Sequence, residues 1–402
     1  MSKPRILVLM HYLELGGAEM SLIGLLQALD PEKVDVDLML HSHRGELMDF
    51  VPEWVNVLPE VAAYDVIEKP LTEALRRRQW GVAFGRALAR IRHRWYVHRH
   101  GPFDVQDASE FSYVAHCVAP FLPRIEQQTE YDLCLSFITP HDYGLKKVRA
   151  RKRLAWIHTD YTNINVNRQL ELPVWSGYDY IASISERVTE TFGKTFPELK
   201  DKIVEIENIL PAEFVRKRSQ EFDASDRMQG TVKLLSIGRF TYPKNFDNVP
   251  DIMHRLVNEH GADAVWYIIG YGGDEALIRS KIAEAGMADR VVLLGKQANP
   301  YPFIRQCDVY VQPSRYEGKS VTVREAQMLC RPVAVTAYPT AASQVRHGYD
   351  GVIMPMDNAG CAEALADFIR NKELQQKITA NLAIGDYGNT GEVDKIYSIL
   401  DK

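Results

Sequence analysis

The chain has 402 residues, a net charge of −5 at neutral pH, 46% apolar residues and 25% charged residues. Such a length exceeds one ordinary hydrophobic core and predicts two or three domains. The composition is typical of a soluble globular enzyme, and it argues against a disordered chain or a nucleic-acid-binding protein. We therefore expect no nucleic-acid partner.

The first residues are basic, but the apolar run Ile6–Met10 that follows is too short for the core of a signal peptide. No stretch approaches the roughly 18 uninterrupted apolar residues that cross a bilayer. We expect a cytoplasmic protein. The cysteines form no C-x-x-C pair, which favours reduced, structural thiols over disulfides or a zinc site; they are Cys117, Cys134, Cys307, Cys330 and Cys361.

Short β-rich runs alternate with helical patterns along the whole chain, which indicates parallel sheets covered by helices. The predicted strands are Ile6–Met10, Val34–His41, Val55–Leu58, Leu133–Phe137, Leu154–His158, Tyr180–Ser185, Lys233–Gly238, Val265–Gly270, Val291–Gly295, Val309–Pro313, Val333–Thr336 and Val352–Met354. We predict an α/β protein with two Rossmann-like, doubly wound domains facing a central cleft, where ligands bind at the carboxyl ends of the strands.

A polar, charged stretch without a strand pattern separates the two sets of strands. It places a first domain at residues 1–215, which includes a basic segment at 71–101. A second domain then covers residues 230–385. Residues 386–402 are expected to form a C-terminal helix that crosses back to the first domain.

The first predicted strand leads through Gly16 and Gly17 into an apolar-periodic helix. Glycine lets a backbone approach a ligand closely, and free N–H groups at a helix start favour an anion such as phosphate. An ordinary tight turn is the alternative. The G-x-G-x-x-G fingerprint of a dinucleotide site is missing, and the acidic pair Asp35 and Asp37 is a weak substitute for it.

The second domain opens with a strand, then Gly238, Arg239 and Lys244 before a helix expected to begin near Asn245 or Phe246. Two cations beside a helix start can neutralise the diphosphate of a nucleotide. Solvated surface charges are the alternative. The next strand also ends in a glycine loop, which contains Gly272.

His158 falls at the end of an apolar predicted strand, where side chains turn toward the cleft. A lone histidine in such a place is either a hydrogen-bonded core residue or a functional group. Both interpretations stay open from the sequence.

Two glutamates, Glu317 and Glu325, flank the passage from a strand into an apolar helix. Thr322 and Glu325 spell the T-x-x-E capping box, so Glu325 is either a helix cap or a ligand-binding acid. No capping role explains Glu317. Carboxylates accept hydrogen bonds from pairs of sugar hydroxyls, and the combination with Arg239 and Lys244 predicts a nucleotide-sugar site.

Backbone N–H groups at the start of this helix are expected to face phosphate or sugar oxygens. The residues concerned are Gly318, Lys319, Ser320 and Val321. No D-x-D element has a plausible position in the cleft, so we expect neither a metal nor another cofactor.

Together these segments resemble the family 4 retaining glycosyltransferases with the two-domain GT-B fold. The resemblance spans nearly the whole chain and rests on "GGAE" (16–19), "WIHTDY" (156–161), "SISERV" (183–188), "IENIL" (206–210), "SIGRFTYPKN" (236–245), "GYGGDE" (270–275), "SRYEGKSVTVREAQML" (314–329) and "HGYDGVIMP" (347–355). The E-x7-E element formed by Glu317 and Glu325 is the most specific of them.

The resemblance implies that Glu325 binds ribose hydroxyls and Glu317 binds the hydroxyls of the transferred sugar. Arg239 and Lys244 would hold the diphosphate without a metal, and Gly16 and Gly17 would border it from the first domain. His158 would lie near the reacting face of the sugar. Many members read E-G-F-G or E-G-L-P after the first glutamate, whereas Lys319 and Ser320 stand here, which leaves the donor sugar open.

Residues 75–101 hold eight arginines and three histidines with no acid between Arg76 and His100. Helical spacing places Phe84, Leu88, Ile91 and Trp95 in one stripe and Arg86, Arg90 and Arg94 in another. This basic amphipathic helix either lies on an anionic membrane surface or packs on its domain with a solvated face. The resemblance favours the membrane.

We therefore expect a retaining, metal-independent transferase that moves a hexose or N-acetylhexosamine from a UDP-sugar to a lipid-linked glycan in the synthesis of a capsule or another surface polysaccharide. It would act in the cytoplasm, peripherally on the membrane. Two alternatives stay open, a non-catalytic nucleotide-sugar-binding subunit and an oxidoreductase with a nucleotide cofactor.

Overall fold

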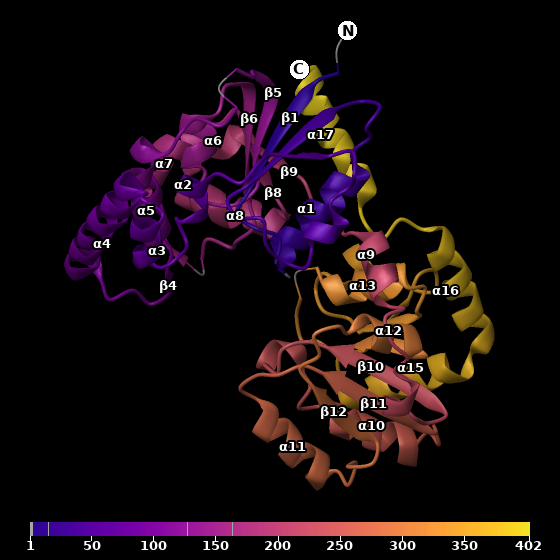
Figure 1. Cartoon of the computed structure of the whole chain (residues 1–402). Coiled ribbons are helices and arrows are strands. Elements are labelled where there is room, and N and C mark those ends of the chain that lie inside the picture. The colour runs from indigo at the N-terminus through magenta and orange to yellow at the C-terminus, as the bar shows by residue number, and fades with distance from the viewer. Residues whose placement is uncertain (1–2, 15, 127, 163, 318) are drawn as a thin grey trace. The chain divides into compact units, whose positions relative to one another are not determined.

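The computed structural model describes residues 3–14, 16–126, 128–162, 164–317 and 319–402. The chain divides into two compact units. Unit 1 comprises Met1–Pro211 and Asn389–Lys402, and unit 2 comprises Ala212–Gly388 (Figure 1). The stretch expected as a linker lies within unit 2, because its helix α9 (Ala212–Arg218) packs there through Phe214 against the ring of Tyr301.

Unit 1 is built on a parallel seven-stranded sheet with the order β3-β2-β1-β5-β6-β8-β9. Its strands are β1 (Arg5–Met10), β2 (Asp35–Leu40), β3 (Asn56–Val57), β5 (Tyr131–Ser136), β6 (Ala150–Ile157), β8 (Tyr180–Ser183) and β9 (Ile203–Glu205). A separate two-stranded ladder joins β4 (Gln106–Asp107) to β7 (Ile164–Asn165). The short strands β4, β7 and β9 were not predicted.

The helices of unit 1 are α1 (Gly17–Ala28), α2 (Ala62–Asp65), α3 (Leu71–Arg76), α4 (Trp80–His100), α5 (Ser109–Val118), α6 (Asp142–Lys147), α7 (Arg168–Ser176), α8 (Glu186–Thr195) and α17 (Val393–Asp401). The last of these is the C-terminal helix, which lies beside the first sheet (Figure 1). The Tyr397 hydroxyl accepts a hydrogen bond from the Asp30 N–H at 2.7 Å. Lys152 Nζ donates to the carbonyls of Ile399 and Leu400, where a cation complements the negative end of a helix.

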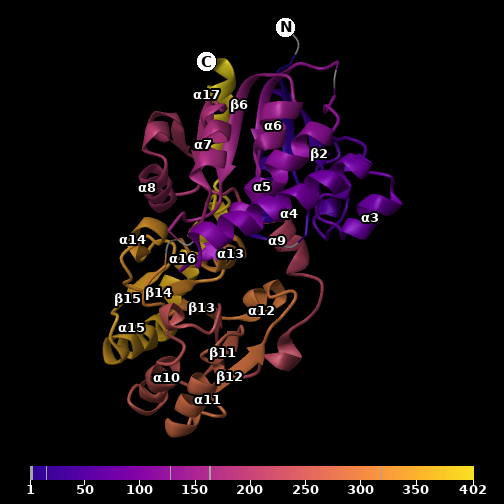
Figure 2. The same cartoon turned by 90° about the vertical axis from the view of Figure 1, so that its left-hand side faces the viewer.

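Unit 2 has a parallel six-stranded sheet with the order β12-β11-β10-β13-β14-β15. Its strands are β10 (Val232–Ile237), β11 (Ala264–Ile269), β12 (Val291–Gly295), β13 (Val309–Gln312), β14 (Val333–Thr336) and β15 (Val352–Met354). Its helices are α9, α10 (Val249–Asn258), α11 (Glu275–Glu284), α12 (Tyr301–Gln306), α13 (Val321–Met328), α14 (Ala341–Gln344), α15 (Asn358–Arg370) and α16 (Lys372–Ile384) (Figure 2).

Every strand predicted from the sequence is present, with ends that differ by a few residues. The reason is that parallel strands are covered on both faces and therefore read as short continuous apolar runs. All residues of β11, β13 and β14 are buried. The two doubly wound α/β units have the predicted fold class.

Strand order reverses beside the first strand of each sheet. In unit 1, β1 lies between β2 and β5, and in unit 2, β10 lies between β11 and β13. Loops leaving such a strand and its neighbour on the other side diverge and leave room for a ligand. The two candidate sites described below lie at these two positions.

The basic segment differs from the expected single helix. Helix α4 begins at Trp80, and Arg78 has a positive φ of 57° that separates it from α3. Arg77 forms ion pairs with Asp65 and Glu73 from the preceding helices. In the portion of the chain that the structure covers, no helix combines the length and the apolar character needed to cross a membrane.

Candidate functional site

The loops after β10 and β13 bring together two residues that the sequence singled out. Lys244 Nζ donates to Glu317 Oε1 at 2.5 Å. The same carboxylate oxygen accepts hydrogen bonds from Ser314 Oγ at 2.6 Å and Gln312 Nε2 at 3.0 Å. Lys244 and Glu317 thus form a partly buried ion pair at the strand-order reversal of unit 2.

The loop that carries Lys244 has a shape set by its neighbours. A Cβ on Gly238 would lie 3.2 Å from the Lys244 side chain, so glycine makes room for the lysine. Asn245 has a left-handed backbone, with φ of 61°, and its Nδ2 donates to the Pro313 carbonyl at 2.8 Å. Because this conformation cannot continue a helix, α10 begins at Val249 rather than at the expected Asn245 or Phe246.

A second ion pair, absent from the sequence-based predictions, fastens the same two loops. The Arg315 guanidinium donates to both carboxylate oxygens of Asp247, at 2.9 and 2.8 Å, and lies 4.1 Å from the centre of the Tyr242 ring. Two parallel N–H···O bonds fix a guanidinium in position as well as in charge. The site is therefore held in place from both strands.

The glycine loop after β11 stacks on the loop after β10. Gly272 has φ of +156°, and a Cβ there would lie 2.4 Å from the Phe240 carbonyl oxygen. The Phe240 N–H donates to the Tyr271 carbonyl at 2.9 Å. A side chain at Gly272 would therefore force the two loops apart.

Arg239, the other predicted cation of this loop, is exposed. It forms no ion pair within the described part of the chain. The two cations therefore differ in their surroundings. Lys244 is paired with a carboxylate, and Arg239 faces solvent.

Of the two interpretations left open for Glu325, the structure excludes the helix cap. The helix begins at Val321 after Ser320, which forms no side-chain cap. Thr322 Oγ1 instead accepts a hydrogen bond from the Tyr310 hydroxyl at 2.7 Å. Glu325 lies within the helix, buried, where it accepts from the Tyr301 hydroxyl at 2.9 Å, and burial raises the pKa of Glu325 to about 7.

The start of α13 is occupied by a protein side chain. The Ser320 N–H donates to Gln344 Oε1 at 3.0 Å, and Gln344 Nε2 donates to the Ser320 carbonyl at 2.6 Å. Lys319 is exposed and Val321 is 44% exposed. Gly318, also predicted to bind the donor, lies outside the described residues. A ligand at this helix start would thus have to compete with Gln344 for the Ser320 N–H.

In unit 1, helix α1 begins at Gly17 with Gly16 as its N-cap, as the sequence predicted. A Cβ on Gly17 would meet no atom within 4 Å. Space is therefore open beside this residue, and its role toward a phosphate stays a prediction.

A cavity at the strand ends of unit 1 has a volume of about 530 Å³. Segments after β1, β2, β5 and β6 form one wall, and α4 and α5 form another. Its lining includes His11, Tyr12, His41, Ile67, Glu68, Arg86, Arg90, Glu110, Phe111, Val114, Ile138, Thr139, Pro140, Tyr143, Trp156, His158 and Thr159. It lies at the strand-order reversal of unit 1, where a doubly wound domain binds its ligand.

His158 follows β6 directly and lines this cavity, so the prediction that it lies at a strand end is confirmed. Its ring is 4.9 Å from that of Phe137 and is stacked beside Trp156. Burial lowers the pKa of His158 to about 4, against an opposing contribution from the Phe137 backbone. Neither ring nitrogen reaches hydrogen-bond geometry with a described residue. The imidazole is therefore held neutral, with both nitrogens covered by neighbouring atoms.

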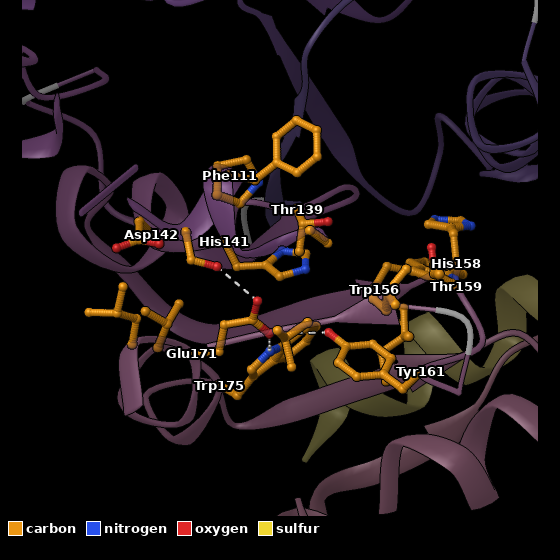
Figure 3. A pocket seen from close by; sticks show the side chains of 18 residues that line it. Phe111, Thr139, His141, Asp142, Trp156, His158, Thr159, Tyr161, Glu171 and Trp175 are labelled. Carbon is orange, nitrogen blue, oxygen red and sulfur yellow. Dashed lines mark hydrogen bonds between the residues drawn. The ribbon is translucent and has the colours of Figure 1, made fainter. Parts of the chain in front are cut away.

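An adjoining cavity of about 60 Å³ contains a polar network that the sequence did not reveal (Figure 3). Glu171 is buried and accepts hydrogen bonds from Ser112 Oγ at 2.8 Å, Trp175 Nε1 at 3.3 Å and the Tyr161 hydroxyl at 3.4 Å. The His141 ring lies 4.4 Å from that of Trp175, and burial lowers the pKa of His141 to about 3. This network positions the wall that the two cavities share.

His11 and Glu68 form a further pair that was missed. His11 Nδ1 lies 2.8 Å from Glu68 Oε1, and the His11 ring stacks on His41 at 4.6 Å. Burial opposes ionisation of Glu68, but the hydrogen bond and charge of His11 together with the charge of Arg44 outweigh it, and the pKa of Glu68 is lowered. His11 follows β1 as His158 follows β6, so its place at a strand end was the signal available in the sequence.

Ligand atoms of His11, His41 and Glu68 lie within 4.8 Å of one another, close enough for a metal ion. His11 and Glu68 satisfy each other, whereas the buried His41 Nδ1 has no hydrogen-bond partner among the described residues. The absence of a metal stays a prediction.

Helix α4 presents two different faces. Arg86 and Arg90 line the large cavity. Phe84, Ile91 and Trp95 are each more than 60% exposed. Most of the predicted apolar stripe is therefore exposed to solvent. Of the arginine stripe, Arg86 and Arg90 line the cavity and Arg94 does not.

Comparison with known proteins places these features in a family context. Residues 217–383 match the family model described as glycosyl transferases group 1. An amylovoran biosynthesis glycosyltransferase, AmsK, of Erwinia amylovora is 25% identical over 242 residues, 52% of this chain and 58% of that protein. A lipopolysaccharide core mannosyltransferase, LpsB, of Rhizobium meliloti is 29% identical over 110 residues, 27% of this chain and 31% of that protein.

The chain thus spans about half the length, or less, of these relatives. Solved structures extend the likeness to the whole chain at lower identity. Alr3699/HepE of Anabaena, solved in complex with UDP, is 14% identical with a TM-score of 0.60 and 99% of each chain covered. A Rickettsia africae glycosyltransferase is 14% identical with a TM-score of 0.61, covering 100% of this chain and 98% of that one. The protein therefore has the GT-B fold, and its residues 217–383 match the glycosyl transferases group 1 family.

Proposed function

We propose that this protein is a retaining glycosyltransferase that moves a hexose or N-acetylhexosamine from a UDP-sugar to a glycan acceptor in surface polysaccharide synthesis. The observation that carries the proposal is the Lys244–Glu317 ion pair at the strand-order reversal of unit 2. It lies inside the stretch that matches the family model. A cation for phosphate and an acid for sugar hydroxyls there suit a nucleotide-sugar.

The proposed donor site assigns each group one part of the substrate. Lys244 and Arg239 take the diphosphate, Glu317 takes hydroxyls of the transferred sugar and Glu325 takes the ribose hydroxyls. The fixed cations stabilise the departing UDP without a metal. We name no protein nucleophile.

The remaining assignments are to the acceptor side and to the backbone of the donor site. Gly238, Gly272, Ser320 and Val321 contribute backbone at the donor, with Gly16 and Gly17 bordering the phosphates. His158 is assigned to the reacting face of the sugar. UDP is the nucleotide proposed because Alr3699/HepE was solved with it.

A thermal-shift panel tests the donor assignment. UDP-glucose, UDP-galactose, UDP-N-acetylglucosamine, GDP-mannose and ADP-glucose are added to the purified protein. A donor present at 100 times its Kd stabilises the folded protein by about 2.7 kcal/mol. We expect a shift with one UDP-sugar, which Lys244→Ala abolishes and Lys281→Ala, on the exposed helix α11, preserves. A shift with NADH instead would favour the oxidoreductase.

Release of UDP separates the enzyme from a non-catalytic binding subunit. We expect UDP release that depends on an added acceptor, and NMR of the product should show the anomeric configuration of the donor. Binding without release would support the non-catalytic alternative, and an inverted product would overturn retention.

We further propose that the acceptor is lipid-linked and that α4 lies on the anionic cytoplasmic face of a membrane. Phe84, Ile91 and Trp95 form an exposed apolar stripe, and Arg94 adds positive charge beside it. An apolar face with flanking arginines and a tryptophan complements such a surface.

Vesicle flotation tests the membrane assignment. The protein should float with vesicles that contain phosphatidylglycerol and less with neutral ones, and Ile91→Ser should weaken flotation. Ile384→Ser is the matched control, because Ile384 is 82% exposed on α16 of unit 2. Equal flotation of both variants, or none for the unmodified protein, would contradict the proposal.

A further inference from the structure

The 530 Å³ cavity of unit 1 has two arginines on one wall. Arg86 and Arg90 are one helical turn apart on α4, and both line the cavity. Arg86 Nη1 donates to the carbonyls of Val66 at 2.9 Å and Lys69 at 2.6 Å, which holds its guanidinium in place. Arg86 is thus a positioned group rather than a mobile surface chain.

Neither Arg86 nor Arg90 forms an ion pair with a residue that the structure describes. Two acids also line the cavity, Glu68 and Glu110. Glu68 is already bound to His11 and lies 3.8 Å from Arg44. Burial and the neighbouring charge of Arg90 both lower the pKa of Arg86, so an anion between the two would relieve a repulsion.

The rest of the cavity suits a sugar. Aromatic and apolar groups, including Phe111 and Trp156, alternate with hydrogen-bonding groups such as Tyr12, His11 and His158. The His158 ring lines the cavity, and neither of its two covered nitrogens has a hydrogen-bond partner among the described residues. The volume of the cavity is in the range of small-molecule sites.

We propose that this cavity binds an acceptor whose sugar carries a phosphoryl group, with Arg86 and Arg90 holding the phosphoryl oxygens and the sugar lying against His11 and His158. Guanidinium groups bind phosphate through paired N–H donors. The exposed apolar stripe on the same helix places a lipid chain on the far side of that phosphoryl group. The inference rests on the proposed transferase function and specifies the class of its acceptor, a sugar joined to lipid through phosphate.

Direct binding tests the inference without any transfer. Calorimetry with glucose 1-phosphate, glucose and inorganic phosphate as probes uses the full chain. We expect glucose 1-phosphate to bind at least tenfold more tightly than either part alone. Arg90→Gln should lower that affinity tenfold or more and leave glucose binding unchanged. Arg151→Gln is the control, because Arg151 lies exposed at the amino end of β6 and pairs with Asp132.

Arg90 is chosen because Arg86 also holds backbone carbonyls, so that its loss endangers folding. A decyl phosphodiester of glucose then separates the lipid from the phosphate contribution. A lipid-phosphate acceptor is supported if that probe binds more tightly than glucose 1-phosphate and if Arg90→Gln weakens the binding of both. Equal effects of Arg90→Gln and Arg151→Gln, or glucose binding as tight as glucose 1-phosphate, would overturn the inference. Failure of the transferase proposal would appear separately, as acceptor binding without UDP release.

Discussion

The two candidate sites differ in how their polar groups are satisfied. In unit 2, Lys244 is bound to Glu317, Glu325 to Tyr301, and the Ser320 N–H to Gln344. In unit 1, His158 is half-buried beside a cavity, and its covered ring nitrogens have no partner among the described residues. Most polar groups of the unit 2 site are thus paired within the protein, apart from the exposed Arg239, whereas His158 in unit 1 is unpaired.

This difference indicates two ways of binding a ligand. A ligand in unit 2 must replace protein partners, so its binding exchanges one set of charge-assisted bonds for another. A ligand in unit 1 that displaced the atoms covering the His158 nitrogens would satisfy buried groups whose isolation is costly, and that relief would favour binding. Substitutions at the ion pair of unit 2 should therefore affect selectivity for charge, and buried titratable groups of both units should set the pH dependence of stability.

The largest expected effect on activity comes from substitutions in the Lys244–Glu317 ion pair. Glu317→Gln and Lys244→Ala should each lower kcat/KM at least about 100-fold, a loss of about 2.7 kcal/mol of transition-state stabilisation. Unfolding free energy should fall by about 2 kcal/mol, because each change leaves a mostly buried partner unsatisfied. Steady-state UDP release and urea unfolding measure the two quantities. Activity of Glu317→Gln equal to that of the unmodified protein would remove Glu317 from the site.

The second prediction contrasts the pH dependence of the two units. His158 and His141 have pKa values lowered to about 4 and about 3, so the unfolded chain takes up their protons first as pH falls. Their contribution to stability is complete above about pH 6.5 and is lost toward pH 4. Glu325 is opposite, since its pKa is raised to about 7. Its contribution is complete below about pH 4.5 and is lost as pH rises toward 7.

Within each of these pH windows, the free energy of unfolding should change by on the order of 1 kcal/mol per pH unit. Urea unfolding between pH 4 and 8 measures it. Glu325→Gln should remove the loss between pH 4.5 and 7, and His158→Gln should flatten the loss below pH 6.5. Slopes that both variants leave unchanged would show that the burial of these groups is not what sets the pH dependence.

The smallest expected effect is on the loop that presents Lys244. Asn245→Gly keeps the left-handed backbone and loses the hydrogen bond to Pro313, whereas Asn245→Ala loses both. We expect about 1 kcal/mol of destabilisation for glycine and about 1 kcal/mol more for alanine. Thermal unfolding compares the two, and a lower Tm for the glycine variant would contradict the backbone argument.

The sequence predicted the strands well because buried parallel strands leave continuous apolar runs such as Val333–Thr336. It also placed His158 at a strand end. It left two interpretations open at the start of α13, where the T-x-x-E sequence allows a cap, and in the structure Glu325 binds Tyr301 instead. A local sequence motif shows only which hydrogen bonds are possible nearby. Burial against α12 favoured the hydrogen bond to Tyr301 over the cap.

What the sequence alone determined is therefore the layering of two parallel α/β units and the set of residues that end their strands, because both follow from local hydrophobic patterns. Tertiary structure decided which of those residues meet. Lys244 and Glu317 are 73 positions apart, and Arg86 reaches the same cavity as His11 and His158. Such meetings depend on strand order in the sheet, and no local pattern in the chain encodes that order.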